Sequence, residues 1–430
     1  MNKTKPFLLK LLFPFLLLFV SIGLTGCWSA HEVNDLAIVN VMGIDQTKTG
    51  QLKVTTVIVK PPELFSESPI GSGNPNRSPF LIQTITGKSM FDVMEKLSNA
   101  LSGKIYLGHL NIVVFGKEAA KHKMGNSLDF LKREHDFRPN IKLLVSRTTA
   151  EEIVKQRPIL NSTIGLEIQD LVKSSRFSTS SMVSDIMKFS EKLEGDIEDA
   201  YTGSVNTVSN NDDSHSNEQT LSTQGQVQPR NRIEEQSNEN PKSDAHALRL
   251  QGTAVFNDGH LQGFLDQDET EGLLLLKGKL HSGSVILDCG PNDNGAVGLK
   301  MMHSQSSYSP HLSQGTPTMD VNINVKADIG DYTCAEKTIN TGRMNELNHQ
   351  FENVLEHQVN EVLAIAQKQW QTDIFGFGKT FYQKYPDEWK ALAPHWKQGL
   401  LKQMDVHVDI SANIERYGLS KEAVKANESR

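Results

Sequence analysis

A long polar segment in the middle of the chain limits how it can fold. The 42 residues from Gly203 to Asp244 contain 7 Ser, 7 Asn and 5 Gln, five aliphatic residues and no aromatic residue. This composition buries too little apolar surface to offset the conformational entropy that is lost on ordering. We therefore predict a flexible, solvated linker over residues 203–245, with folded units on both sides. The alternative is a binding arm that folds on a partner.

The first 26 residues have the pattern of a secretory signal. Three lysines and no acid accompany an apolar run from Leu11 to Val20, which is too short for a comfortable transmembrane span. The run ends at Leu24-Thr25-Gly26-Cys27, and an aliphatic residue, two small residues and a cysteine form the bacterial lipoprotein signature. We therefore predict removal of residues 1–26 and lipidation of Cys27.

Lipidation would place the mature chain on the outer leaflet of a bacterial cytoplasmic-type membrane. Two acyl chains anchor a protein durably, whereas a single chain binds only marginally. Removing the signal takes away three lysines, so the net charge of −7 becomes −10. This acidic balance argues against nucleic-acid binding, which requires a basic footprint.

The two other cysteines, Cys289 and Cys334, could pair in an exported protein. The sequence does not decide this, and we favour unpaired thiols.

Strands and helices alternate before the linker, which predicts an α/β domain over residues 80–202. Ser89 can cap one of the helices, with Asp92 three residues later. The expected strands are Asp35–Ile44, Leu52–Lys60, Phe80–Thr86, Leu110–Phe115 and Ile141–Ser146.

After the linker the pattern predicts an α+β domain over residues 281–425, with antiparallel strands under helices. Along Met319–Ala327 apolar and polar residues alternate, so one face of that strand is buried. From about Gly342 to Gln371 apolar residues recur at three- and four-residue steps, which indicates a long helix. Just after the linker, Asp258-Gly259 separates two strands of a hairpin.

Isolated two-stranded hairpins are only marginally stable in water. The hairpins at 35–60 and 248–265 lack partners nearby in sequence, so we predict that they share a sheet. Residues 27–79 would then form a small β-rich domain together with 246–280. The expected fold class is α/β and α+β, with three domains of mixed sheets flanked by helices.

Motifs that would indicate chemistry are weak. Gly378-Lys379-Thr380 resembles the end of a phosphate-binding loop, but Asp373 holds the position of its first glycine, and we interpret it as a turn between helices. The acids at Asp266–Glu271 favour a helix N-terminus over a calcium site. His349 and His357 lie two turns apart, which indicates a solvated helix face instead of a metal site. Eight aromatic residues between 370 and 396 predict a helical core, with one or two at a protein interface.

The chain resembles the C-subunit lipoproteins of spore germinant receptors, the GerC-type or Ger(x)C family. The resemblance covers nearly all of the mature chain, in order, although the central linker is longer and more polar than the family usually has. The stretches that carry it are Leu24–Trp28, Glu32–Ala37, Gly43–Asp45, Tyr106–His109, Leu128–Leu131, Gly252–Phe256, Glu269–Leu273, Asp373–Gly378, Tyr385-Pro386 and Trp389.

The resemblance implies a three-domain α/β architecture and a non-enzymatic receptor subunit on the outer face of the spore inner membrane. It implies assembly with two polytopic membrane subunits, a need for the protein in the nutrient response, and no catalytic, cofactor or metal residue. The competing interpretations are a solute-binding lipoprotein of a transport system and a surface hydrolase. The first should show two α/β lobes around a cleft, and the second a nucleophile with a base.

Overall fold

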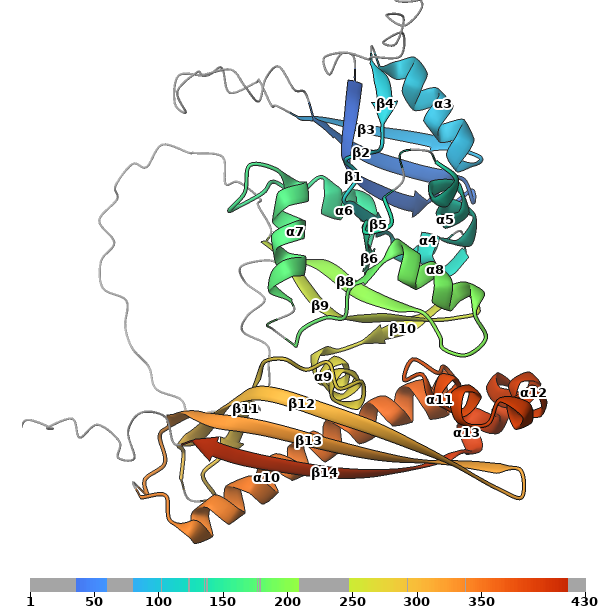
Figure 1. The fold of residues 1–430 in the computed structure, drawn as a ribbon. Coiled ribbons are helices and arrows are strands. Elements are labelled where there is room, and N and C mark those ends of the chain that lie inside the picture. The colour runs from blue at the N-terminus through green and yellow to red at the C-terminus, as the bar shows by residue number, and fades with distance from the viewer. Residues whose placement is uncertain are drawn as a thin grey trace, which may run out of the picture.

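The computed structural model describes residues 36–59, 80–208 and 247–416, apart from residues 102, 123, 135, 137, 176, 178, 292 and 337. These residues form two sheets, stacked one above the other in Figure 1. Cys27 lies outside the described residues, as do 209–245 of the predicted linker. The mixed α/β, multidomain fold class is confirmed.

The first sheet has ten strands, of which eight follow one another in the order β10-β9-β8-β6-β5-β1-β2-β3. Its centre is parallel, with β5 between β1 and β6, while both ends are antiparallel. The short β4 and β7 pair with β1 and β6. The strands are β1 (Leu36–Gln46), β2 (Leu52–Val59), β3 (Phe80–Gly87), β4 (Lys104–Tyr106), β5 (Ile112–Phe115), β6 (Lys142–Ser146), β7 (Ser184–Asp185), β8 (Tyr201–Val208), β9 (Ala247–Asn257) and β10 (His260–Leu265).

Helices cover both faces of this sheet, which is why its central strands are apolar throughout. In β5, Val113 and Phe115 pack into one core, and Ile112 and Val114 into the core on the opposite face. The first core includes α3 (Met90–Ala100), α4 (Lys117–His122), α5 (Met124–Arg133) and α8 (Ile186–Glu194), and the second includes α6 (Ala150–Val154) and α7 (Ile164–Ser174). Ser89 accepts the expected hydrogen bond from the Asp92 amide, at 3.2 Å.

The predicted small domain of two hairpins is wrong. Both hairpins belong to the ten-stranded sheet, but β8, β6 and β5 lie between them, so β1–β2 never pairs with β9–β10. Each hairpin finds other partners in the same continuous sheet, since β1 pairs with β5, β2 pairs with β3, and β9 pairs with β8.

The predicted linker starts too early. Residues 203–208 form most of β8, where Val205 is fully buried and pairs with Leu250. The Ser204 hydroxyl donates to the Gln251 carbonyl, so a polar side chain here satisfies a buried backbone group. Composition alone did not indicate the strand, because β8 is stabilised by neighbours on both sides, β6 and β9.

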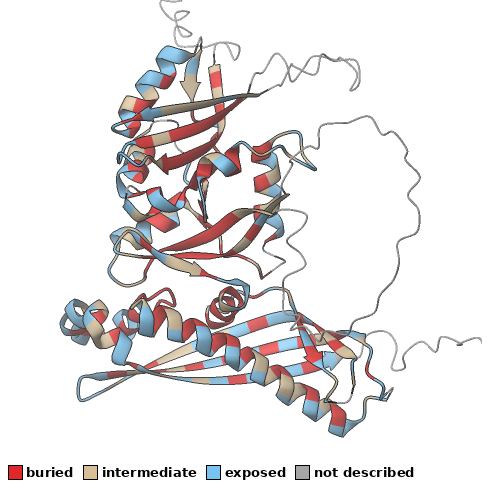
Figure 2. Ribbon diagram, turned by 180° about the vertical axis from the view of Figure 1, so that it is seen from behind, coloured by how far each residue is buried: buried red, intermediate tan, exposed pale blue. Residues whose placement is uncertain are grey.

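The second sheet contains the strands β11 (Gly283–Asp288), β12 (Ala296–Ser313), β13 (Thr316–Tyr332) and β14 (Asp405–Arg416), in that order. The predicted alternation in β13 is confirmed, because Val321, Ile323 and Val325 are buried beside exposed polar neighbours, and Figure 2 shows this alternation along the strands. Its last strand runs parallel to β13 instead of antiparallel, since the connecting helices return the chain to the same end.

The long helix α10 (Thr341–Leu363) covers the apolar face of the second sheet. It ends earlier than expected and continues as the π-helical turn η3 (Ala364–Gln369). The remaining elements are α11 (Phe377–Lys384), α12 (Pro386–His395), η4 (Trp396–Leu400) and α13 (Leu401–Gln403).

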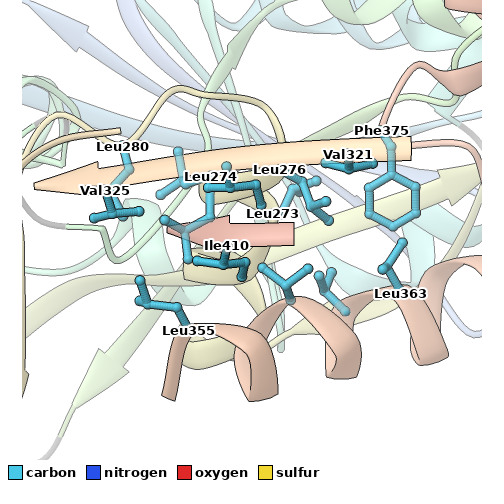
Figure 3. Close-up of a cluster of buried hydrophobic side chains, with 14 of the residues drawn as sticks. Leu273, Leu274, Leu276, Leu280, Val321, Val325, Leu355, Leu363, Phe375 and Ile410 are labelled. Atoms are coloured by element: carbon cyan, nitrogen blue, oxygen red, sulfur yellow. The ribbon is translucent and has the colours of Figure 1, made fainter. Parts of the chain in front are cut away.

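The helix α9 (Gln267–Leu276) belongs to the core between the second sheet and α10, although our domain division placed it with the small hairpin domain. Leu273, Leu274 and Leu276 pack with residues of α10, β13 and β14 in Figure 3. Gly272 permits this packing, because a β-carbon there would lie 2.3 Å from the carbonyl oxygen of Gln358 on α10.

Cys289 and Cys334 form a disulfide, which corrects our preference for unpaired thiols. They follow β11 and β13, which both run antiparallel to β12 and so end at the same side of the sheet. The sequence could not indicate this, because 45 residues separate the two cysteines and only the strand order brings their Cα atoms to 5.5 Å.

Candidate functional site at the junction of the two sheets

Several of the stretches that carry the family resemblance meet where the two sheets join. Gly252–Phe256 is in β9, Glu269–Leu273 is in α9, and Asp373–Gly378 leads into α11. All three contact one another or the loop that connects α8 to β8. The hydroxyls of Thr253 and Thr270, for example, lie 3.1 Å apart in the interior.

Asp373 organises the last of these stretches. Its carboxylate is completely buried and accepts hydrogen bonds from the amides of Gly376, Phe377 and Gly378 at 2.9, 2.9 and 2.6 Å. The indole of Trp396 donates a fourth, at 3.0 Å. Burial raises the pKa of Asp373 to about 6, although these donors favour its charged form.

Glycines allow the backbone to close around this carboxylate. Gly376 has φ +84°, a conformation that side-chain-bearing residues rarely adopt. A β-carbon on Gly378 would lie 2.8 Å from the Trp389 ring and 3.0 Å from the carbonyl of Ile197. Helix N-termini attract anions, and here the anion is the chain's own Asp373. The interpretation of Gly378-Lys379-Thr380 as a turn between helices is wrong, because these residues form the first turn of α11 itself and the turn ends at Gly376.

A second aspartate connects Asp373 to the first sheet. The Asp199 amide donates to the Asp373 carbonyl at 2.9 Å, and the Asp373 amide donates back to the Asp199 carboxylate at 2.7 Å. The Lys397 ammonium lies 2.7 Å from the same carboxylate. It also lies 3.2 Å from the carboxylate of Asp258, in the β9–β10 turn. Burial raises the pKa of Asp199 and outweighs the nearby Lys397, which lowers it.

Lys277, just after α9, completes the junction. Its ammonium donates to Glu198 at 2.8 Å and to the carbonyls of Ile374 and Phe375 at 2.9 and 3.1 Å. Lys192 binds the same carboxylate at 2.6 Å and lies 3.7 Å from the centre of the Tyr201 ring. Burial alone would raise the pKa of Glu198, but the two lysines outweigh burial and lower it.

Glu271 is a buried acid on the inner side of α9. Its carboxylate accepts a hydrogen bond from the Gln358 amide at 3.1 Å, and burial raises its pKa to about 7. At the start of α9, Asp266 and Glu269 form a reciprocal capping box, which confirms the helix N-terminus expected for these acids.

A pH-dependent contribution to stability follows from Glu271. Because its pKa in the folded state lies above the ordinary value of 4.5, its contribution is complete below pH 4.5 and is lost as the pH rises through about 7. We expect Glu271→Gln to remove this dependence. As the pH rises from mildly acidic to mildly alkaline, the free energy of unfolding of the variant should increase by about 2–3 kcal/mol relative to that of the parent. Urea unfolding across that range measures it. The exposed Glu356→Gln on α10 is the control, and equal pH slopes for Glu271→Gln and the parent would contradict the expectation.

The other residues singled out from the sequence lie on exposed helix faces, pack in a core or cap a helix. His349 and His357 are 78% and 72% exposed, as expected of a solvated helix face, and contact Glu352 and Glu361. Seven of the eight C-terminal aromatic residues belong to or pack against the core between the second sheet and α10, while Tyr382 is half exposed. In the first sheet, Asp45 caps α6 by accepting from the amides of Ala150 and Glu151, both at 2.8 Å.

Sequence reasoning missed Glu198, Asp199, Lys277 and Lys397, since no local pattern distinguishes them from surface charges. Asp373 was noticed only as a residue that a phosphate loop would not tolerate. Across the described ranges, no helix combines the length and the apolar character needed to cross a membrane.

Two family models match the chain one after the other. Residues 29–207 match the spore germination protein N-terminal domain, and residues 251–418 match the C-terminal domain described as spore germination B3/GerAC like. The junction described above contains residues from both matched ranges, with Glu198 and Asp199 in the first and Lys277 and Asp373 in the second.

Known relatives are similar along their whole length. Spore germination protein KC of Bacillus subtilis is 27% identical, over 97% of this chain and 98% of that protein. Spore germination protein B3 of the same species is 22% identical, over 93% of this chain and 96% of that protein. Spore germination protein GerQC of Bacillus cereus is 19% identical, over 88% of this chain and 94% of that protein.

A solved structure has the same fold. The crystal structure of the GerBC protein superposes with a TM-score of 0.52 and 17% identity, over 87% of this chain and 96% of that one. At this identity the likeness concerns the fold alone, whereas the family models cover both halves of the sequence. The chain therefore belongs to the GerAC-like, or Ger(x)C, family of spore germination proteins.

Proposed function

We propose that this protein is a lipid-anchored, non-catalytic subunit of a spore nutrient germinant receptor. The observation that carries the proposal is the end-to-end similarity to spore germination proteins, through both family domains in order. It would assemble with two polytopic receptor subunits and be required for the response to germinants.

The proposed anchor is a diacylated Cys27 on the outer face of the spore inner membrane. The lipoprotein signature at Leu24–Cys27 supports it. Because β1 begins at Leu36, the connection from Cys27 can extend about 30 Å at most. The tether would thus hold the first sheet near the bilayer and raise the effective concentration of the protein around membrane partners.

The junction supports a scaffold more than a reactive site. The carboxylates of Asp199, Asp373 and Glu198 each accept hydrogen bonds that join one half of the chain to the other or cap a helix. A general base needs its lone pairs free for a substrate proton, and these carboxylates are already engaged within the protein. The surface-hydrolase alternative gains no support from them.

The solute-binding alternative predicts two α/β lobes. The second sheet differs from such a lobe, since Asn322, Asn324 and Lys326 on the face opposite α10 are exposed. We therefore retain receptor assembly as the proposed role. Affinity capture of the full-length chain from spore membranes tests it directly. Recovery of two multi-span proteins supports the proposal, and recovery of the chain without any multi-span partner contradicts it.

The change Cys27→Ala tests the anchor. Without the thiol no diacylglycerol can be attached, so we expect the variant to leave the membrane fraction and the spores to respond weakly to nutrients. Sedimentation, intact mass and the germination rate measure these effects. Ser29→Ala, just outside the lipoprotein signature, is the matched control and should keep anchor and response. A normal response from an unanchored Cys27→Ala chain would rule out the anchoring role.

A further inference from the structure

A cleft of about 520 Å³ lies between the two halves of the chain, beside the junction. One wall comes from Ser181–Asp185 and the start of α8, and the other from the segment 279–282 that leads from α9 to β11. Figure 1 shows α8 and α9 on opposite sides of the boundary between the two sheets. Its volume lies within the range typical of small-molecule sites.

Positive charge predominates around this cleft. Four lysines and one histidine line it, against one acid, Asp185. The basic residues are Lys142, Lys188, Lys192, Lys279 and His281. This excess is notable in a chain whose net charge is −7, because a concave surface of one sign concentrates ions of the opposite sign.

Of these five basic residues, Lys142, Lys188 and Lys192 already have interaction partners. Lys188 contacts Asp185 at 3.4 Å, and Lys192 contacts Glu198 at 2.6 Å. Lys279 and His281 are exposed at the opposite wall, and neither has an acidic partner within 4 Å among the described residues. These two side chains therefore remain available to bind an anion.

The remaining surface of the cleft suits an organic body attached to that anion. Met182, Leu274 and Leu280 contribute apolar surface, and each is itself mostly buried, so the wall is rigid. Hydroxyls of the wall are partly engaged already, since Ser181 and Ser184 donate to backbone carbonyls at 2.8 Å. Recognition would then depend on charge from the lysines and on apolar contact.

From this arrangement we propose that the cleft binds a small organic anion, a carboxylate or a phosphate ester with an apolar body, held by Lys279 and His281. Lys279 and His281 lie on one wall, and contact of the apolar body with Met182 on the other wall would let the bound molecule bridge the two halves of the chain and stabilise the junction. The inference goes beyond the proposed receptor role and does not depend on it, since neither the lipid anchor nor the membrane subunits contribute to the cleft.

Calorimetric titration of the full-length chain in detergent tests the proposal, with succinate and phenyl phosphate as anionic probes. Uncharged succinamide is the matched control ligand. We expect saturable binding of one molecule per chain for at least one anion, weakened by added salt, and none for succinamide.

The double variant K279Q/H281Q should bind the same anion roughly 10- to 100-fold more weakly, as expected for the loss of charge-assisted hydrogen bonds. Lys379→Gln removes an exposed lysine of α11 that lies away from the cleft and should bind like the parent. Equal affinity of K279Q/H281Q and the parent would overturn the proposal. So would the absence of saturable binding by either anion, or equal binding of succinamide. If the double variant folds poorly, Lys279→Gln alone provides the same comparison.

Discussion

Replacing Asp373 by alanine is expected to lower the free energy of unfolding by about 3–5 kcal/mol. The substitution leaves four donors without an acceptor in the interior, namely three backbone amides of the α11 N-terminus and the Trp396 indole. Each unsatisfied buried donor costs about 1–3 kcal/mol, and partial relaxation of the turn recovers some of that.

Urea denaturation, followed by tryptophan fluorescence, measures this loss. Asp387→Ala on α12 is the matched control, because that side chain is 89% exposed, and its stability should stay within about 0.5 kcal/mol of the parent. Asp373→Asn should give an intermediate loss, since its amide keeps one acceptor oxygen for the turn. A loss below about 1 kcal/mol for Asp373→Ala would show that the turn does not depend on this carboxylate.

The change Lys277→Met is expected to cost about 2–4 kcal/mol and to loosen the junction between the two sheets. Methionine keeps the length of the side chain but leaves the carbonyls of Ile374 and Phe375 without this donor. Among the described residues, Glu198 would then keep Lys192 as its cationic partner. The Lys277 side chain is only 9% exposed, so water replaces the lost donor poorly.

Hydrogen exchange locates this effect as well as measuring it. We expect faster exchange of the amides of residues 373–378 in Lys277→Met, because their loop is held by this lysine from one side and by Asp199 from the other. Lys279→Met, two residues further along at an exposed position, should leave both stability and exchange unchanged. Uniformly faster exchange across both sheets would indicate general destabilisation, and unchanged exchange at 373–378 would contradict the role of Lys277.

Charged groups as well as apolar contacts therefore join the two halves of the chain. Asp199 and Glu198 come from the first sheet, and Asp373, Lys277 and Lys397 from the second half. Buried ionic groups of this kind contribute more to a unique geometry than to net stability. The junction fixes the relative position of the two cleft walls, and hence the distance between Lys188 and Lys279.

The alternation along β13, the stripe on α10, the capping box of α9 and the apolar run of β5 could all be predicted from the sequence. Each depends on neighbours within a few residues, where the period of a strand or helix decides which side chains are buried. The lipoprotein signature at Cys27 is likewise a local pattern, and the expectation drawn from it concerns a residue outside the described ranges.

The tertiary structure alone decided the strand order, the Cys289–Cys334 disulfide and the roles of Asp373 and Lys277. The position of β8 between β6 and β9, and the meeting of Asp199 with Asp373 across 174 residues, depend on contacts that no local period encodes. Local periodicity tells which face of an element is buried. Which distant partner covers that face, and which charges meet there, is determined only when the whole chain packs.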